Sequence, residues 1–516
     1  GAACSENHER RGEQEAHGGA ETKGGGGSCA RVNVWQESGG GGRIWVMRYL
    51  LFLGCLLMGG AVMAQDGAVF RLATFSVDVT IPKGHPCMGG GIAPAKEVAD
   101  PLYAKGFVLT GGGRPMVLVS FDWCEIRGTS FEKWQQALAV AAGTEPERVM
   151  IHSTHVHDAP VMEEEAEKLL REMEATGEWK KIPPPAPEAA IQVASVCWPA
   201  FNDECIGRVA SALSEALPKA RRVTHLGLGK AEVQQVASNR RYLGGDGRVF
   251  YNRMSRSTIP EAQAADVGTI DPWLRTLSFW DGDTPVCALH GYAVHPMSSY
   301  GKGRVSADFP GRAREMMQAA YPEVLQIYAS GCSGNVTAGK WNAGAPDNLE
   351  VLAGRLHAAM DAAWKGTQKV PLEQSQFRMV RMPLGARNTL AHTETILRKR
   401  LAEGVSPFER AEAAMGLAWY ERVKRGHRVQ VPCVDFGLAQ VLLLPAEAYV
   451  EFQLFAQACR PDSFVFTLGY GECGPGYIPI ERSWKEQDSN LNDWAWTPPG
   501  SEAVMKKAIR EVLAAP

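Results

Sequence analysis

The chain has 516 residues, of which 45% are hydrophobic and 22% are charged, a composition typical of globular proteins with a large core. Its formal net charge is only -3 and its body has no long basic block, which argues against nucleic acid as the main partner. The length fits two or three domains, or one large α/β domain.

The N-terminal segment differs from the rest of the chain in composition. Residues 1–46 are polar and contain two glycine runs without hydrophobic periodicity, so we predict disorder or an over-extended start there. Residues 47–64 have a basic start, an apolar run from Leu50 to Val62, and small residues before a cleavage site near Ala64. This pattern predicts a signal peptide and an exported protein, periplasmic or extracellular, because the apolar run is short for a membrane span.

After the N-terminal segment, the sequence first predicts several strands and one helix. In chain order, the hydrophobic pattern indicates strands at 69–79, 107–110 and 116–122 and a helix at 130–142. A further strand follows the helix and leads into three histidines. Because a strand-helix-strand unit normally brings its two strands side by side in parallel, we expect this last strand to lie next to an earlier one.

The stretch from Val149 to Pro160 is the most informative part of the chain. Three apolar residues run into a segment with three histidines and an aspartate, and a proline ends the segment. On an extended strand, His155 and His157 point to one face, about 6–7 Å apart, and can converge on one ion or substrate. His152 would lie on the opposite face as structural support. The alternative is a strand end with two hydrogen-bonded histidines.

The remainder of the body predicts further strands that end in polar residues. Residues 161–195 combine an acidic helical stretch with a run of prolines and predict an insertion or lid over the histidines. One later strand ends at His295, and another, at 434–444, comes shortly before Glu447. Helices are predicted at 203–217, 310–320, 347–364 and 501–513, and a helical hairpin at 389–425.

Strands that end in a polar residue followed by Gly or Pro indicate the fold class. In sheets covered by helices, functional sites gather at the carboxyl ends of the strands. We therefore expect an α/β fold with a mixed, mostly parallel sheet covered by helices, in a single large catalytic domain at 65–516.

Four side chains at strand ends or helix starts have the ligand chemistry of zinc, namely His155, His157, His295 and Glu447. A catalytic zinc binds neutral imidazoles and carboxylates, keeps a position for water, and lowers the pKa of that water. Each residue also has a structural interpretation. His295 could end a strand before Pro296, and the dipole of a helix favours a carboxylate in its first turn.

Several other classes of protein are excluded by their missing motifs. A metallo-β-lactamase site would need Asp and His where Ala159 and Pro160 stand, and no H-E-x-x-H occurs. The G-x-S-x-G elbow, the Walker A sequence and the Rossmann fingerprint are also missing. None of the 12 cysteines forms a C-x-x-C motif, which excludes a zinc ribbon or a thioredoxin-type site.

Seven segments, in order, resemble motifs of the neutral (non-lysosomal) ceramidase family. The first is Ser153–His157, which is similar to the S-A-T-H-T-H-S-G-P segment of that family. The other six are Ser238–Arg240, Ala293–Pro296, Val305–Gly311, Ser333–Thr337, Leu444–Glu447 and Gly476–Ile478. The resemblance implies a shorter, bacterial-type member with a ceramidase-like zinc-hydrolase domain at 65–516 and without the C-terminal immunoglobulin-like domain of the family.

The resemblance also implies a metal site. Zn²⁺ would be held by His155, His295, Glu447 and Tyr477, and Tyr470 lies close to the last of these in the sequence. The implied reaction is hydrolysis of an amide (N-acyl) bond by zinc-activated water.

Further residues would take part in catalysis. The resemblance makes His157 the general base and proton shuttle, and Arg240 the residue that stabilises the oxyanion or orients the substrate. Tyr477 and Thr337 complete the implied catalytic set. Thr337 and Asn335 depart from the family pattern, which has Ser and Asp at these positions.

The implied substrate is ceramide or a related lipid amide, with a peripheral contact to a membrane. One alternative keeps the scaffold and cleaves a small non-lipid amide or an ester. The other is a catalytically reduced binding protein, for which Thr337 and Asn335 are the support.

Overall fold

The computed structural model describes residues 69–177, 191, 193–389, 391–492 and 494–514. All of them belong to one unit, Gln65–Pro516. The region predicted to be disordered (1–46), the predicted signal peptide with its cleavage site (47–64) and the middle of the predicted lid (178–190) lie outside the described residues.

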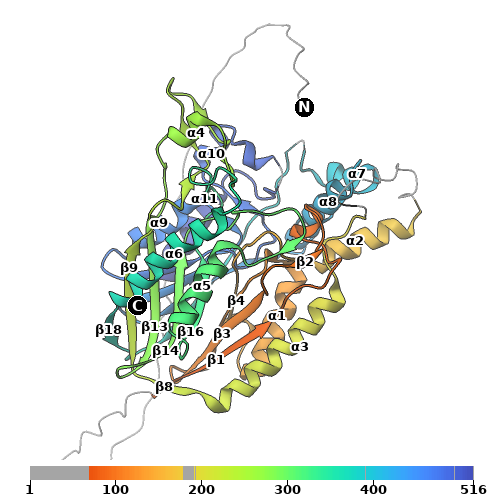
Figure 1. Cartoon of the computed structure of the whole chain (residues 1–516). Helices are drawn as coiled ribbons and strands as arrows, with labels where there is room; N and C mark the ends of the chain where they lie inside the picture. The colour runs from red at the N-terminus through yellow and green to blue at the C-terminus, as the bar shows by residue number, and fades with distance from the viewer. Residues whose placement is uncertain (1–68, 178–190, 192, 390, 493, 515–516) are drawn as a thin grey trace, which may run out of the picture. The chain divides into compact units, whose positions relative to one another are not determined.

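The first of three larger sheets contains the strand that leads to the histidines. Its order is β6-β4-β3-β1-β8. The strands are β1 (Phe70–Asp78), β3 (Tyr103–Thr110), β4 (Met116–Phe121), β6 (Val149–Ser153) and β8 (Arg221–Val223). Helices α1 (Gly128–Ala142) and α3 (Pro199–Ala216) pack on β6 and β1, respectively (Figure 1). Every residue of β4 is buried, as its continuous apolar run predicts.

The second sheet has the order β16-β14-β13-β9-β18. Its strands are β9 (His225–Glu232), β13 (Trp273–Asp281), β14 (Thr284–Tyr292), β16 (Leu325–Ser330) and β18 (Gln368–Pro371). Helix α5 (Asp308–Ala320) packs on β16, and α6 (Asn348–Lys365) packs on β9 and β13 (Figure 1).

The third sheet has the order β19-β20-β21-β23. Its strands are β19 (Gln376–Met382), β20 (Val429–Asp435), β21 (Ala439–Leu443) and β23 (Phe464–Leu468). Helices α9 (Val450–Cys459) and α11 (Ser501–Leu513) pack on β23 and β19, respectively.

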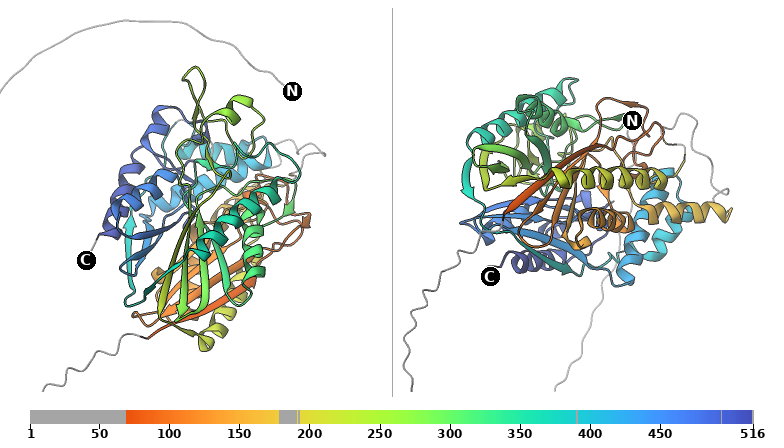
Figure 2. Two further views of the ribbon diagram at one scale, coloured as in Figure 1. Left: turned by 60° about the vertical axis from the view of Figure 1, so that its left-hand side comes forward. Right: turned by 90° about the horizontal axis from the view of Figure 1, so that it is seen from below.

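The three sheets share one apolar core. A single cluster of buried side chains joins Phe107 and Leu118 of the first sheet, Leu277 and Ile327 of the second, and Phe466 of the third. Figure 2 shows from two further sides that the strands stand next to one another while helices lie outside them. The shared core fixes the relative positions of the strand ends, which belong to segments far apart in the sequence.

The mixed α/β class is confirmed, but the expectation of a mostly parallel sheet is wrong. Each larger sheet contains one parallel pair, β4–β6, β14–β16 or β21–β23, and its other pairs are antiparallel. The reason lies in the connections. The short turns at Gly111–Gly113 and at Gly282–Asp283 join β3 to β4 and β13 to β14, and such a short connection can only join antiparallel strands.

The parallel pairs are strand-helix-strand units, and they position the polar residues at the strand ends. The units are β4-α1-β6, β14-α5-β16 and β21-α9-β23. In each unit the carboxyl ends of the two strands lie at the same edge of the sheet, where ligand-binding residues gather in α/β folds. His155 follows β6, His295 follows β14, and Glu447 follows β21.

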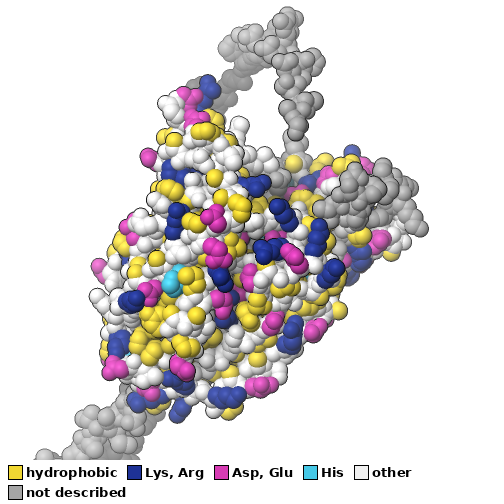
Figure 3. Space-filling view, viewed as in Figure 1, with side chains coloured by type: hydrophobic (Ala, Val, Ile, Leu, Met, Phe, Trp, Pro, Cys, Tyr) yellow, Lys and Arg dark blue, Asp and Glu magenta, His cyan; other side chains and the backbone are white. Residues whose placement is uncertain are grey.

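Three further helices lie in segments for which the sequence predicts them. Helix α2 (Glu164–Ala175) lies in the stretch interpreted as a lid and packs on α8 (Pro407–Lys424), which with α7 (Glu394–Glu403) occupies the predicted hairpin. Among the described residues, no helix is both long enough and apolar enough to cross a membrane. Figure 3 shows basic and acidic side chains intermingled on one face, in line with the small net charge.

Candidate metal centre

Three buried side chains from three separate strand ends meet at one point. The Nε2 atoms of His155 and His295 are 3.1 Å apart. The Oε2 atom of Glu447 lies 3.2 Å from the former and 3.1 Å from the latter. All three side chains are at most 3% exposed. His155, His295 and Glu447 therefore form one compact cluster of potential metal ligands.

The hydrogen bonds of the two imidazoles show which ring nitrogens face each other. Nδ1 of His155 is 3.1 Å from the carbonyl oxygen of Cys124, and Nδ1 of His295 is 2.6 Å from that of Ser333. A carbonyl oxygen only accepts, so each Nδ1 carries the proton and each Nε2 presents a lone pair. Burial lowers the pKa of His295 to about 3, which favours the neutral ring.

Two nitrogen lone pairs and a carboxylate oxygen thus point at a common centre. Three acceptors at this spacing repel one another unless a cation lies between them. The three atoms form a triangle with edges of 3.1, 3.1 and 3.2 Å, and zinc usually lies ~2.0–2.1 Å from imidazole nitrogen and carboxylate oxygen, so these residues would hold one ion between them. The donor set and its spacing fit a divalent metal that binds imidazole and carboxylate.

Glu447 is positioned by a short bridge between two strand ends. Glu447 lies in β22 (Glu447–Ala448), which pairs in parallel with β24 (Tyr477–Ile478). It therefore sits in a bridge and not in the first turn of a helix, the structural alternative considered from the sequence.

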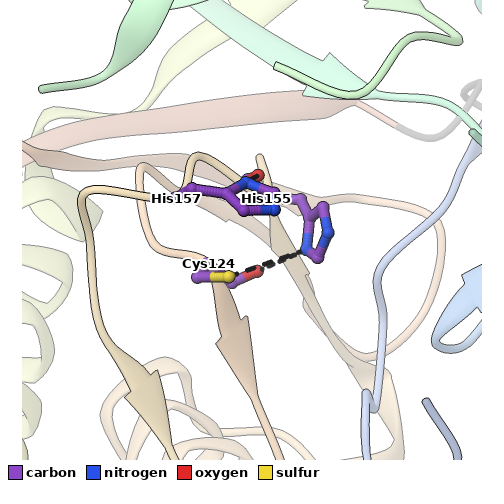
Figure 4. A group of neighbouring side chains, drawn as sticks. All are labelled: Cys124, His155 and His157. Carbon is purple, nitrogen blue, oxygen red and sulfur yellow. Dashed lines mark hydrogen bonds between the residues drawn. The ribbon is translucent and has the colours of Figure 1, made fainter. Parts of the chain in front are cut away.

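The expected extended histidine strand is wrong in its geometry, although both rings are in the site. Strand β6 ends at Ser153, and His155 has φ 66°, a left-handed conformation that is uncommon and strained for histidine. The turn still brings the rings of His155 and His157 together, with centroids 4.9 Å apart and planes at 80°. Figure 4 shows them next to Cys124.

His157 lies beside the cluster but is oriented differently. Its Nδ1–H donates to the backbone carbonyl of His155 at 3.1 Å, so its Nε2 keeps a lone pair for another group. Burial lowers the pKa of His157 well below the ordinary value, and the neighbouring His155 and His295 add to this effect. His157 also lines the cavity in front of the cluster.

His152 has the structural role predicted for it. Its Nδ1–H donates to the carbonyl of Gly469 at 2.8 Å, and its Nε2 accepts from the backbone N–H of Ser330 at 3.0 Å. The ring therefore ties the end of β6 to the ends of β16 and β23. Burial lowers its pKa to about 4.

The two candidate tyrosines have different surroundings. The ring of Tyr470 stacks on His155 at 4.3 Å between centroids, and its hydroxyl bonds to that of Ser333 at 2.7 Å. The hydroxyl of Tyr477 accepts a hydrogen bond from Nη1 of Arg240 at 2.9 Å. Tyr477 lines the cavity, whereas Tyr470 supports the back of the His155 ring.

Arg240 is a buried cation in the cavity wall. It is 2% exposed, and its backbone N–H donates to the carbonyl of Asn335 at 2.8 Å. Its Nη1 is bonded to Tyr477, while its Nε has no hydrogen-bond partner within the described residues. A buried N–H donor without a partner is costly, so it marks a place where a substrate oxygen can bind.

Thr337 and Asn335 are not among the residues that line the cavity, and the catalytic role implied for Thr337 stays a prediction. The Thr337 hydroxyl donates to the carbonyl of Met254 at 2.8 Å and accepts from the N–H of Gly339 at 3.2 Å. Asn335 accepts from the N–H of Val450 at the start of α9. Its amide group also donates to Oε2 of Glu451 at 2.9 Å, so both side chains are engaged in bonds within the fold.

The cavity also contains residues that the sequence analysis missed. Its volume is ≈ 140 Å³. Besides the residues above it is lined by Met88, Cys124, Glu125, Met254, Ser255, Met297, Tyr300 and Trp494. Cys124 and Glu125 follow β4, the parallel neighbour of β6, so the rule that led to His155 also points to them. Burial raises the pKa of Glu125 to about 7, against the effect of Arg127.

Comparison with known proteins identifies the fold. No family model matches the sequence, and no curated protein is matched. Among solved structures, the chain is similar to a ceramidase complexed with C2, with a TM-score of 0.59 and 16% identity over 86% of this chain and 75% of that chain. It is also similar to the neutral ceramidase from Pseudomonas aeruginosa, with a TM-score of 0.60 and 18% identity over 87% of this chain and 74% of that chain. The resemblance in fold expected from the seven segments is confirmed.

Proposed function

We propose that the chain is a member of the neutral ceramidase family and hydrolyses an amide (N-acyl) bond with the help of a zinc ion. The observation that carries the proposal is the cluster of His155, His295 and Glu447, in which three acceptor atoms within 3.2 Å face one point. The likeness in fold to ceramidases over most of the chain supports the choice of reaction. Tyr477, which is linked to Arg240 and Glu447, is the fourth candidate ligand.

The residues around the cluster fit the two proton transfers of amide hydrolysis. A bound zinc ion would polarise the carbonyl group and lower the pKa of water toward neutrality. The free Nε2 of His157 takes a proton from the attacking water and delivers it to the leaving amine. The Nε–H of Arg240 has no partner in the described structure and donates to the carbonyl oxygen as negative charge develops on it.

The cavity favours a substrate of which only the reacting part is enclosed. Its volume of ≈ 140 Å³ is small beside the roughly 300–1,000 Å³ that encloses a whole drug-sized ligand. Met88, Met254, Met297 and Trp494 form an apolar wall. Tyr300 and Met254 are 37% and 40% exposed, so apolar surface continues from the wall to the outside. This arrangement suits a substrate whose acyl chain extends from the cavity, as in ceramide or a related lipid. It also suits a peripheral contact between the rim of the cavity and a membrane.

The same small volume supports a second candidate, hydrolysis of a small non-lipid amide. Turnover of N-acyl substrates of increasing chain length distinguishes a lipid amide from a small amide as the substrate. For a lipid hydrolase, kcat/KM should rise with the length of the acyl chain. The third candidate is a catalytically reduced binding protein; Thr337 and Asn335, on which it rests, bond within the fold and do not line the cavity.

Metal analysis of residues 65–516 tests the central claim. We expect about one zinc per chain, and loss of both zinc and amide hydrolysis in His295→Ala. His290→Gln is a matched control, because His290 is also buried but its ring nitrogens bond to Thr276 and Gln326. Purified protein that hydrolyses amides equally well after removal of all bound metal would contradict the proposal.

Export through the signal peptide 47–64 is a separate part of the proposal, supported by the sequence pattern. Expression of the full chain in a bacterial host, followed by N-terminal sequencing of the mature protein, tests it. We expect a mature N-terminus near Gln65 in the exported fraction. An intact segment on cytoplasmic protein would contradict export.

A further inference from the structure

Glu125 carries a buried carboxylate oxygen that the centre itself does not use. The residue begins β5 (Glu125–Ile126), is 1% exposed and lines the cavity. Its Oε2 pairs with the guanidinium of Arg127. Its Oε1 has no hydrogen-bond partner within the described residues. A buried acceptor without a partner is costly, so its position in a cavity wall indicates a missing donor.

His155 does not supply this donor. Its Nδ1 is 3.8 Å from Oε1 of Glu125, which is too far for a hydrogen bond. The Nδ1–H is instead directed to the carbonyl of Cys124 at 3.1 Å. Glu125 is therefore not the group that orients the imidazole, although it lies behind it.

Arg127 fixes the carboxylate in its present position. The guanidinium lies against the rings of Trp494 and Trp496, 4.8 Å from each centroid, and its Nη1 contacts the sulfur of Met415 at 3.5 Å. Held by these contacts, Arg127 keeps Oε2 and leaves Oε1 for the cavity.

The surrounding charges select the kind of donor. Arg127 balances the charge of Glu125, so the pair as a whole has no net charge to attract a cation. A neutral hydroxyl finds an acceptor there without changing the charge of the site.

We propose that Glu125 is a specificity-determining residue, whose Oε1 accepts a hydrogen bond from a hydroxyl group that the substrate carries close to its scissile amide. This inference rests on the proposed amide hydrolysis and adds the residue through which the site would prefer an N-acylated amino alcohol to an N-alkyl amide of the same size. A site built around a hydroxyl rejects an analogue that lacks it, because the buried acceptor is then left without a partner.

Two isosteric probes and one isosteric variant test the proposal. The probes are N-dodecanoyl-ethanolamine and N-dodecanoyl-propylamine. Tryptophan fluorescence measures the Kd of each probe, and amine release measures kcat/KM. Both are measured at about pH 8, so that the carboxylate of Glu125 is charged. We expect the wild type to prefer the ethanolamide by about tenfold or more in both quantities. In Glu125→Gln the amide oxygen must face the donors of Arg127, so its NH₂ group faces the cavity and the preference is lost.

Glu163→Gln is the matched control. Glu163 is a second buried carboxylate close to Arg127, but it does not line the cavity, so this variant keeps the preference. Equal affinity of the wild type for both probes would overturn the inference. A Glu125→Gln variant that binds both probes equally more weakly and loses zinc would also overturn it, because Glu125 would then only support His155.

The two readouts keep this inference separate from the proposed function. Preferential binding of the ethanolamide without hydrolysis of either probe would sink the proposed hydrolysis and leave the role of Glu125 intact. Hydrolysis of both probes without any preference would overturn the role of Glu125 and leave the proposed hydrolysis intact.

Discussion

At the scale of single residues, the chemistry of the centre depends on where two protons lie. The carbonyl oxygens of Cys124 and Ser333 hold the Nδ1–H groups of His155 and His295, and this leaves both Nε2 lone pairs directed at Glu447. Such backbone acceptors fix the tautomer and the ring orientation of metal-binding histidines. The centre is thus preorganised for a cation by main-chain atoms that side-chain substitution cannot remove.

Arg240 is the residue whose replacement separates catalysis from metal binding. In Arg240→Lys the positive charge remains but the Nε–H that we propose as donor to the carbonyl oxygen is lost, so we expect kcat to fall about 10²-fold while the zinc content stays the same. Steady-state kinetics together with metal analysis measure both quantities. Arg241→Lys is the control, because Arg241 bonds to Glu486, and it keeps kcat within about twofold. Full activity of Arg240→Lys would show that Nε–H is not used.

His290 makes the stability of the protein depend on pH. Burial lowers its pKa to about 4 from an ordinary value of 6.5, so the unfolded chain binds a proton at a pH where the folded chain does not. Stability contributed by the neutral ring is therefore complete above pH 6.5 and is lost as the pH falls toward 4. Between pH 6.5 and 5 the loss amounts to about 2 kcal/mol.

Urea unfolding of the wild type and of His290→Gln at pH 7 and pH 5 measures this contribution. The variant has no titrating ring, so its free energy of unfolding should fall less between the two values, by about 2 kcal/mol. An identical fall in both proteins would mean that His290 is not the titrating group.

At the scale of elements, the strand-helix-strand units explain why some site residues could be predicted and others could not. His155, His295 and Glu447 each follow an apolar run that the sequence displays, so strand ends predicted them. Glu125 also follows a predicted strand, but its partner Arg127 depends on Trp494 and Trp496 from the other end of the chain. Contacts of that range leave no trace in local periodicity.

In the sheets, too, local features could be predicted from the sequence and contacts between distant segments could not. The strands and their short turns are visible as local patterns, and the antiparallel pairs β3–β4 and β13–β14 follow from those turns. The sequence predicts more parallel pairs than the structure has. The strand-helix-strand units are visible in the sequence, whereas antiparallel pairs such as β1–β8 and β9–β18 join strands that lie far apart in the chain. The left-handed turn at His155 also escaped prediction, since no glycine marks it.

Strand β17 (Val336–Thr337) provides an element-scale test of whether Thr337 acts in catalysis or in the fold. It pairs with β10 (Ser238–Asn239), and its threonine hydroxyl holds Met254 and Gly339 through their backbone groups. Thr337→Ser keeps this hydroxyl, so kcat/KM should stay within about twofold. Thr337→Val leaves both backbone groups without a partner and should lower the free energy of unfolding by about 1–3 kcal/mol. A stable Thr337→Val protein with abolished kcat would instead assign the hydroxyl to catalysis.

At the scale of the whole molecule, the centre lies where three sheets with a common core end. Residues of all three contribute to the apolar cluster around Leu118, Ile327 and Phe466, and the three ligand candidates follow one strand of each sheet. An ion bound by all three candidates therefore adds a direct link between strand ends that His152 already joins by hydrogen bonds. Because the unfolded chain has no such site, binding must stabilise the folded state.

Thermal unfolding with and without metal tests this coupling. With free zinc at about a thousand times its Kd, the folded state gains about 4 kcal/mol, so the Tm of the zinc-loaded protein should exceed that of the chelator-treated protein by several degrees. His295→Ala is the control, since without one ligand its Tm should not respond to zinc. If the wild type bound one zinc but unfolded at the same temperature in both states, the ion would lie on a single element and not between the three sheets.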